Sequence, residues 1–262
     1  MLSAVIIISF LSGAGYAENN RKVKCIAHRG ASAYAPENTL ASFKKAIEQK
    51  ADFFECDVHL SKDGEVVVIH DDYLERTTNG KGLVKEKTLK ELKELDAGSW
   101  FFGDYASERI PTLEETLDVA KGKIGVVIEI KNGPFFYKGI EGKVVDLIKK
   151  KEMVDDVIVI SFDHASLKKI KKIAPKIKTG VLYYGNILNA PAVARAAGAR
   201  QIAVGHELAT EKLIKDAHKN NMEVNLWTID DPQTMKKFID MGVDAITTNK
   251  PDVLLEVLEG KD

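Results

Sequence analysis

From residue 24 onward, short hydrophobic runs alternate along the chain with longer amphipathic stretches. The short runs hold four to seven residues rich in valine and isoleucine, which is typical of buried parallel strands. The stretches between them repeat apolar residues at a spacing of three and four, which predicts helices. Eight strands are predicted in this way, over residues 24–27, 53–58, 124–130, 157–161, 179–183, 201–204, 223–228 and 245–248.

Capping residues mark several of the predicted helices. Asn38 is expected to cap a helix over residues 39–49, and Thr112 with Glu115 forms a capping box that opens another. Further helices are predicted over residues 88–95, 165–173, 211–220, 233–240 and 252–258. Eight strand–helix units in about 235 residues predict a (β/α)8 TIM barrel. An open doubly wound sheet is less consistent with the sequence, because no glycine-rich nucleotide motif follows any strand.

One long interval interrupts this alternation, between His70 and Pro111. We interpret residues 71–111 as a small insertion near the mouth of the barrel, after the second strand and its hairpin, so that residues 23–260 form a single barrel domain. The insertion contains an aromatic cluster that we expect to form a small core, or alternatively part of a lid: Trp100, Phe101, Phe102 and Tyr105.

The first seventeen residues carry no charged side chain. Residues 4–11 are apolar and small residues follow them as far as Ala17, which is the pattern of a secretory signal peptide over residues 1–17. A membrane-spanning helix needs about 20 apolar residues, so this stretch is short for a permanent anchor. We therefore expect export to the periplasm or the extracellular space. An uncleaved leader or a misassigned start is the alternative, and the protein would then be cytoplasmic.

The composition limits the possible partners. The chain has 38 basic and 39 acidic side chains, a formal net charge of −1, which argues against a broad basic face for nucleic acid. No stable membrane partner is indicated, and the oligomeric state is left open. The two cysteines, Cys25 and Cys56, lie in apolar runs and are expected as buried thiols, with a disulfide as the alternative.

Residues whose side chains could take part in catalysis collect at the predicted carboxyl ends of the strands, where barrel enzymes carry their catalytic groups. Strand side chains alternate, so residues two apart share a face. The residues concerned are His28 and Arg29 after the first strand, Glu55 and Asp57 in the second, Glu129 and Lys131 at the end of the third, and Trp227 near the end of the seventh.

A predicted hairpin brings His70 to the same end of the barrel. Residues 58–60 and 65–69 are extended runs joined across Asp63-Gly64, which is a strong two-residue turn signal. If these two residues form the loop, the residue numbers of each facing pair add to 127, and His70 faces Asp57. His59 has the wrong parity for this face. The other remaining histidines, His164, His206 and His218, are expected to be solvated or to cap a helix.

Three converging carboxylates, Glu55, Asp57 and Glu129, suit one hard divalent cation, Mg²⁺ or Ca²⁺. Buried like charges repel, so the cluster would be costly or partly protonated without a cation. The alternative is a metal-free cluster balanced by Arg29 and Lys131, and zinc is less expected because it recruits histidine or cysteine. Two histidines titrating near neutrality and two cations able to hold a phosphate complete a set suited to phosphoryl transfer.

With these residues identified, the chain resembles the metal-dependent glycerophosphodiester phosphodiesterases of bacteria. Residues 26–82 carry the motif blocks of that family almost without interruption, IAHRGASAYAPENTLASFKKAIEQKADFFECDVHLSKDGEVVVIHDDYLERTTNGKG. Later blocks are RIPTLEETL, VVIEIK, ISFDH, VNLWTID and DAITTNKP. The resemblance covers about residues 23–258, and several blocks in order are more specific than one short motif.

The resemblance implies a barrel that hydrolyses glycerophosphodiesters to an alcohol and sn-glycerol 3-phosphate. The related phosphoinositide phospholipases C imply that a substrate hydroxyl attacks phosphorus and that water opens the resulting cyclic phosphate, with two histidines exchanging acid and base roles. By resemblance, the general acid/base pair is His28 and His70, the ligands of one Mg²⁺ or Ca²⁺ are Glu55, Asp57 and Glu129, the phosphate contacts are Arg29 and Lys131, the supporting residues are Glu37 and Asn38, and Trp227 walls the glycerol side.

Two alternatives to this function stay open. Residues 183–205 show the least family pattern, so the head group of the substrate is not determined. A lysophospholipase D or sphingomyelinase D type of phosphodiesterase is the first alternative, and it needs room for an acyl chain near the mouth. A non-catalytic phosphodiester-binding barrel is the second, and the presence of both histidines with all three carboxylates argues against it.

Overall fold

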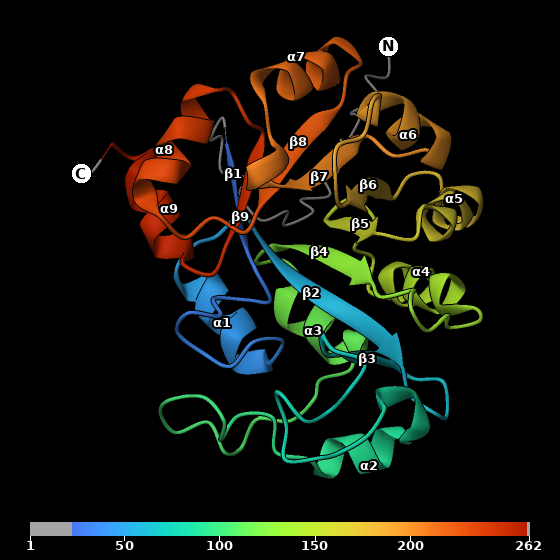
Figure 1. The fold of residues 1–262 in the computed structure, drawn as a ribbon. Coiled ribbons are helices and arrows are strands. Elements are labelled where there is room, and N and C mark those ends of the chain that lie inside the picture. Colours follow the sequence, from blue (N-terminus) through green and yellow to red (C-terminus); the bar gives the residue numbers. More distant parts are fainter. Residues whose placement is uncertain (1–22, 261–262) are drawn as a thin grey trace, which may run out of the picture.

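The computed structural model describes residues 23–260, and the predicted leader over residues 1–17 lies outside them. Eight parallel strands close into a barrel with helices on its outside (Figure 1). Around the barrel the order is β1–β9–β8–β7–β6–β5–β4–β2, and the pairing of β1 with β2 closes it. The predicted fold class is therefore confirmed. The strands are β1 (Lys24–Ala27), β2 (Phe53–Leu60), β4 (Gly125–Ile130), β5 (Val157–Ser161), β6 (Lys178–Tyr183), β7 (Gln201–Gly205), β8 (Glu223–Trp227) and β9 (Ala245–Thr248).

A helix follows each barrel strand along the chain, and the two helices that were not predicted are α4 and α6. No helix within residues 23–260 is long and apolar enough to cross a membrane. The barrel helices are α1 (Leu40–Glu48), α3 (Leu113–Ala120), α4 (Ile140–Lys150), α5 (His164–Ile173), α6 (Ala190–Ala197), α7 (Glu211–Lys219), α8 (Pro232–Asp240) and α9 (Pro251–Leu258).

The caps of two helices test the sequence reasoning. The capping box of Thr112 and Glu115 opens α3, as predicted. The predicted Asn38 cap of α1 is wrong, because Thr39 is the N-cap and forms a capping box with Ser42. Asn38 instead turns its side chain to the barrel and donates to Asp57 Oδ2 at 2.8 Å.

The core lies between the strands and the helices. Alternate strand residues such as Phe54, Cys56 and Val58 point outward into this main core, where Phe54 stacks on Phe43 of α1 at a ring distance of 4.4 Å. The opposite faces of the strands fill the barrel interior with a smaller apolar cluster. Both cysteines are buried thiols, as expected, and burial raises the pKa of Cys56.

The hairpin is one residue out of the predicted register. The second hairpin strand, β3 (Val66–Val68), pairs antiparallel with β2 so that Val58 faces Val68, and paired positions add to 126 rather than 127. The cause is a three-residue loop, since the backbone N–H of Ser61 donates to the Glu65 carbonyl at 2.9 Å. The prediction that His70 lies opposite Asp57 is therefore wrong. His70 still reaches the mouth of the barrel because β3 ends at Val68, so strand alternation no longer sets its direction.

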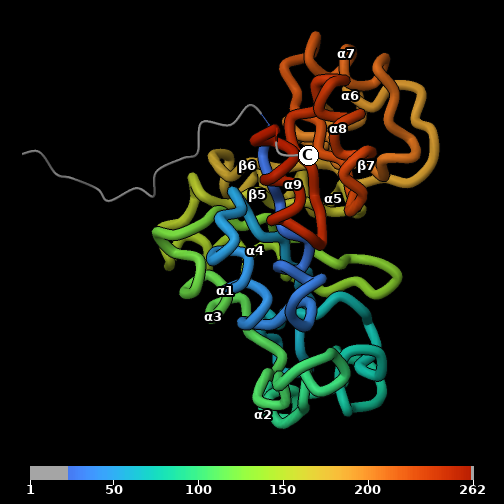
Figure 2. The backbone as a smooth tube through the Cα atoms, turned by 90° about the vertical axis from the view of Figure 1, so that its left-hand side faces the viewer, coloured from blue at the N-terminus to red at the C-terminus, as the bar shows by residue number. Residues whose placement is uncertain are grey.

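Residues 71–111 form a lobe at one side of the barrel, between β3 and α3 (Figures 1 and 2). This lobe contains η1 (Val84–Glu86) and α2 (Leu89–Glu94). The expectation that its aromatic residues form its core is wrong, because Trp100 is 42% exposed and Phe102 is 93% exposed. Aliphatic side chains from β3, α2 and the loops fill the core instead, namely Val67, Ile69, Leu74, Val84, Leu92, Ala97 and Ile110.

Candidate active site

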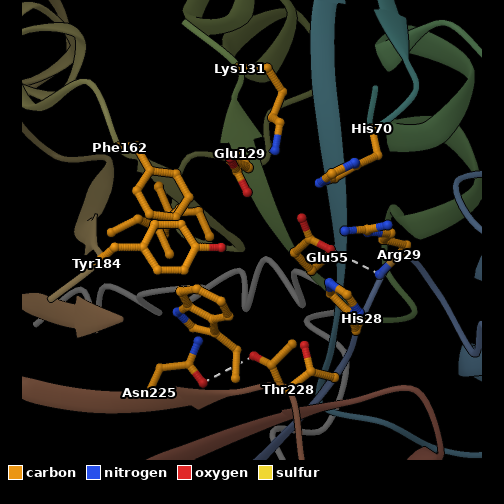
Figure 3. Close-up of a pocket in the computed structure, with 14 residues that line it drawn as sticks. His28, Arg29, Glu55, His70, Glu129, Lys131, Phe162, Tyr184, Asn225 and Thr228 are labelled. Carbon is orange, nitrogen blue, oxygen red and sulfur yellow. Dashed lines mark hydrogen bonds and ion pairs between the residues drawn. The ribbon is translucent and has the colours of Figure 1, made fainter. Parts of the chain in front are cut away.

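A cavity of about 280 Å³ opens at the carboxyl ends of the strands and has two unlike walls (Figure 3). A charged wall comes from β1, β2, β4 and the end of the hairpin, and an aromatic wall comes from β5, β6 and β8. Seven of the ten predicted site residues line it: His28, Arg29, Glu55, His70, Glu129, Lys131 and Trp227. Of the other three, Glu37 and Asp57 contact Arg29 of this lining from behind, and Asn38 donates from its backbone N–H to the Arg29 carbonyl and from its side chain to Asp57.

The three predicted metal ligands converge within the charged wall. One oxygen from each of Glu55, Asp57 and Glu129 lies within 4.8 Å of the others, and all three residues are buried. Burial and the charges of its two acidic neighbours raise the pKa of Glu55 well above its usual value. Burial also raises the pKa of Glu129 to about 7, although the ion pair with Lys131 opposes the shift. A cation would relieve this strain between like charges, so the carboxylates fit a metal site.

Two cations flank the carboxylates on the charged wall. Lys131 Nζ lies 2.9 Å from Glu129 Oε1 and 3.5 Å from Asp57 Oδ1. Arg29 Nε lies 3.5 Å from Asp57 Oδ2 and is buried without a hydrogen-bond partner in the described structure. Burial opposes ionisation of Asp57, but Lys131 and Arg29 hold its pKa well below the usual range. The wall therefore combines an ionised carboxylate with two cationic side chains, Arg29 and Lys131, that line the cavity.

The loop after β1 contributes to this wall through residues with unusual backbone conformations. Arg29 has a positive φ of 53° and Asn38 one of 57°, a conformation that costs free energy and recurs at functional sites. The backbone N–H of Arg29 donates to Glu55 Oε2 at 2.9 Å. Gly30 follows with a φ of 81°, and a Cβ there would collide with Ser42 of α1. Glycine is therefore required where the loop packs on the helix.

His28 is oriented by the end of the last strand. Its Nδ1 lies 2.8 Å from Asn249 Oδ1. Asn249 in turn donates from Nδ2 to Asp230 Oδ2 at 2.6 Å and from its backbone N–H to Asp230 Oδ1 at 2.7 Å. Since the amide oxygen can only accept, the His28 proton sits on Nδ1 and leaves Nε2 as an acceptor. Burial and the neighbouring Arg29 lower the pKa of His28 to about 4, so the ring is neutral.

His70 is oriented by a carboxylate rather than an amide. Its Nδ1 lies 2.5 Å from Asp71 Oδ1, and partial burial lowers its pKa, although Asp57 and Asp71 act in the opposite direction. The backbone carbonyl of His70 lies 3.1 Å from Nε2 of His59, whose Nδ1 lies 2.9 Å from the Tyr137 hydroxyl. His59 is not among the residues that line the cavity, which agrees with its predicted parity. His59 is buried and holds the backbone that carries His70.

The aromatic wall faces these groups across the cavity. Phe162 and Tyr184 stack in parallel at a ring distance of 5.1 Å, and Trp227 stands edge-on to both. Tyr184 is 75% exposed at the rim. The indole Nε1 of Trp227 is buried and has no hydrogen-bond partner within residues 23–260. This wall offers an apolar surface to a ligand that the charged wall holds.

Comparison with known proteins agrees with this geometry. The profile of the glycerophosphoryl diester phosphodiesterase family matches residues 28–253, which is most of the chain. The chain belongs to this family. It is therefore an enzyme, a phosphodiesterase with an acidic group that can hold a metal.

Similar proteins cover nearly the same length. A glycerophosphodiester phosphodiesterase from Caldanaerobacter subterraneus subsp. tengcongensis is 42% identical over 90% of this chain and 98% of its own. One from Bacillus altitudinis is 36% identical over 90% and 98%. Among solved structures, an Oleispira antarctica phosphodiesterase in complex with the product sn-glycerol-3-phosphate superposes with a TM-score of 0.85, at 32% identity over 90% and 96% of the two chains.

Sequence reasoning missed several residues of this family member's site. Phe162 and Tyr184 each follow directly on a barrel strand, so the rule that found His28 could have found them. Asn249 follows the eighth predicted strand, but only its contact with His28 shows what it does. Asp71 is adjacent to His70 in the sequence, but only its side-chain contact shows what it does. Asp230 and Arg76 act on other side chains across loops, and no spacing in the sequence indicates these contacts.

Proposed function

We propose that this chain hydrolyses small glycerophosphodiesters to an alcohol and sn-glycerol 3-phosphate, with His28 and His70 as the acid/base pair. The observation that carries the proposal is that both imidazoles line the cavity beside the buried carboxylates while their Nδ1 atoms are engaged elsewhere. Family membership, and a solved relative in complex with sn-glycerol-3-phosphate, support the same reaction.

One divalent cation, Mg²⁺ or Ca²⁺, would be held by Glu55, Asp57 and Glu129. Hard cations of this kind prefer carboxylate oxygens, and these three buried oxygens lie within 4.8 Å of one another. When bound, the ion polarises the phosphate and offsets its negative charge. The raised pKa values of Glu55 and Glu129 support the assignment, because both carboxyl groups resist ionisation without a cation.

The two histidines have environments suited to complementary proton transfers. Neutral His28 accepts the proton of the attacking substrate hydroxyl at Nε2, and the hydroxyl oxygen forms a bond to phosphorus. The bond from phosphorus to the head-group oxygen breaks, and this oxygen takes a proton from Nε2 of His70, whose imidazolium form the Asp71 carboxylate stabilises. Water then opens the cyclic phosphate as the two rings exchange roles, which leaves sn-glycerol 3-phosphate.

The remaining predicted residues hold the substrate in place. Arg29 and Lys131 would bind the phosphate oxygens, since both cationic side chains line the cavity beside the carboxylates. Glu37 keeps the Arg29 guanidinium in place through a 2.8 Å hydrogen bond, and Asn38 does the same for the Asp57 carboxylate. Trp227 would wall the glycerol moiety.

A second candidate is a lysophospholipase D type reaction on the same phosphodiester bond. The observation that favours it is the apolar surface of Ile160, Leu182 and the exposed Tyr184 along one wall of the cavity. The insertion aromatics Trp100 and Phe102 are not among the residues of this lining. A non-catalytic binder is disfavoured, since binding alone would not require two imidazoles with supported Nδ1 atoms.

The test is release of glycerol 3-phosphate from glycerophosphocholine, measured after chelation and again with Mg²⁺ or Ca²⁺ added back. Activity restored by a divalent ion is the expected result. Faster release of choline from lysophosphatidylcholine than from glycerophosphocholine would favour the second candidate. A folded protein that hydrolyses neither compound with any ion would contradict both.

A further inference from the structure

Arg76, in the insertion, holds two carboxylates with one guanidinium. It donates from Nε to Asp71 Oδ2 at 2.6 Å and from NH2 to Asp71 Oδ1 at 3.0 Å. It also donates from NH1 to Glu37 Oε2 at 2.7 Å and from NH2 to Glu37 Oε1 at 2.8 Å. Every nitrogen of the guanidinium therefore contacts one of two bidentate partners, an arrangement that only the planar fork of arginine supplies.

Each of these carboxylates holds a residue of the charged wall. Asp71 contacts His70 Nδ1 at 2.5 Å, and Glu37 accepts from Arg29 NH1 at 2.8 Å. Burial opposes ionisation of Asp71, but its hydrogen bonds to Arg76 and His70 lower its pKa to about 2. An ionised Asp71 accepts the Nδ1 proton of His70, which leaves Nε2 of that ring facing the cavity.

We propose that Arg76 is a positioning residue that sets the orientation of His70 through Asp71 and of Arg29 through Glu37 at the same time. The inference rests on the proposed function, since it assigns a purpose to contacts behind the proposed acid/base and phosphate-binding groups. Arg76 touches neither of these groups directly in the contacts described above. Its effect passes through the two carboxylates, each of which would otherwise be held only by the residue that it orients.

The position of Arg76 also explains what the insertion contributes. Arg76 lies early in residues 71–111, just after the segment that carries His70, whereas Glu37 belongs to the loop between β1 and α1. The guanidinium thus joins the lobe to the loop that builds the charged wall. With 44% of its side chain exposed, Arg76 sits in a partly screened environment. We therefore expect its contribution to lie in geometry more than in charge.

The first experiment compares Arg76→Ala and Arg76→Lys with the wild type on glycerophosphocholine. Displacing a reacting group by about 1 Å costs on the order of 10²-fold in rate, so we expect Arg76→Ala to lower kcat/KM by about 10- to 100-fold. Both a lower kcat, from His70, and a higher KM, from Arg29, are expected. Arg76→Lys should recover only part of the loss, because one ammonium cannot make two bidentate pairs.

Arg109→Ala is the matched control. Arg109 lies in the same insertion, but among residues 23–260 its guanidinium donates only to the insertion's own backbone carbonyls, those of Ala106 and Glu108 at 2.8 Å each. We expect its kcat/KM to stay within about threefold of the wild type. An equal loss in this variant would overturn the proposal, because general loosening of the lobe would then explain both effects.

Rescue by added guanidinium ion tests the positioning role directly, because an unfolded variant would not regain activity. Added at millimolar concentration, it should restore part of the activity of Arg76→Ala and none of the activity of His70→Ala. Unchanged kcat/KM in Arg76→Ala, or a loss of kcat at constant KM with no rescue, would contradict the positioning role while leaving the proposed function intact. Wild-type protein without activity on any diester would instead contradict the proposed function.

Nitrogen NMR of the His70 ring gives a readout that needs no activity. The wild type should show His70 protonated on Nδ1, with the signals assigned by their absence in His70→Asn. In Arg76→Ala, Asp71 is released and the ring should shift toward a mixture of tautomers. Identical ring shifts in the wild type and Arg76→Ala would overturn the proposal.

Discussion

The charged wall and the aromatic wall of the cavity are held in different ways. On the charged wall, Arg29, His28 and His70 each have a side-chain partner behind them that fixes their direction. On the aromatic wall, Phe162 and Tyr184 have ring contacts with each other and with Trp227, and Tyr184 is largely exposed. Proton transfer and phosphate binding require fixed geometry, whereas contact with an alcohol group does not. Substitutions of the reacting groups are therefore expected to lower activity more than substitutions of the aromatic rim.

The two walls also come from different parts of the chain. The charged wall is formed by β1, β2, β4 and the hairpin, all within the first half, where the motif blocks are dense. The aromatic wall uses β5, β6 and β8, and Tyr184 lies between the ISFDH and VNLWTID blocks of the sequence. The charged residues of the cavity therefore come from the first half of the chain, and its aromatic residues come from the second.

The largest expected effect comes from breaking the charged wall at His70. His70→Ala should lower kcat on glycerophosphocholine by about 10²- to 10⁴-fold, because it removes a proton donor from the reaction. Mg²⁺ binding, measured by calorimetry, should survive, since the carboxylate ligands are untouched. Unchanged turnover would exclude His70 from proton transfer.

An intermediate effect is expected from pH on metal binding. Burial raises the pKa of Glu129 to about 7, so at pH 6 the ion must displace a proton, whereas at pH 8 the carboxylate is already ionised. Affinity for Mg²⁺ should therefore be roughly tenfold higher at pH 8 than at pH 6, with proton release on binding at the lower pH.

Glu129→Gln sharpens this test because glutamine cannot ionise. It should bind Mg²⁺ more weakly than the wild type at both pH values and lose the part of the pH dependence that belongs to Glu129. Equal affinity of the wild type at pH 6 and pH 8, or unchanged affinity in Glu129→Gln, would remove this residue from the metal site.

The smallest effect is expected on the aromatic wall. Tyr184→Ala should lower kcat/KM for glycerophosphocholine by about threefold to tenfold, since one exposed ring supplies only part of an apolar contact. Its metal affinity should equal that of the wild type. Phe102→Ala is the matched control, because Phe102 is an exposed aromatic outside the cavity lining and should leave kcat/KM unchanged. A loss of activity in Tyr184→Ala as large as that in His70→Ala would remove the contrast between the two walls.

Some of this site could be read from local patterns. Alternation along β2 places Glu55 and Asp57 on one face, and the same rule places Glu129 of β4 with Lys131 just after it, so their convergence followed once a closed barrel was predicted. The position of His70 was harder to predict from the sequence. A single additional loop residue changed the pairing of β3, and the ring reached the cavity only because the strand ends two residues earlier. Register of this kind depends on loop geometry that the Asp63-Gly64 signal does not specify.

The sequence by itself determined the barrel, the ends of its strands and the residues that they carry. It could do so because hydrophobic periodicity and strand alternation are local properties of the chain. Only the tertiary structure decided which side chains stand behind these residues. Asn249 reaches His28 from 221 positions away, and Arg76 reaches Glu37 from 39 positions away. Such contacts form when closure of the barrel brings distant loops to one rim, and no local pattern encodes the distance between two loops.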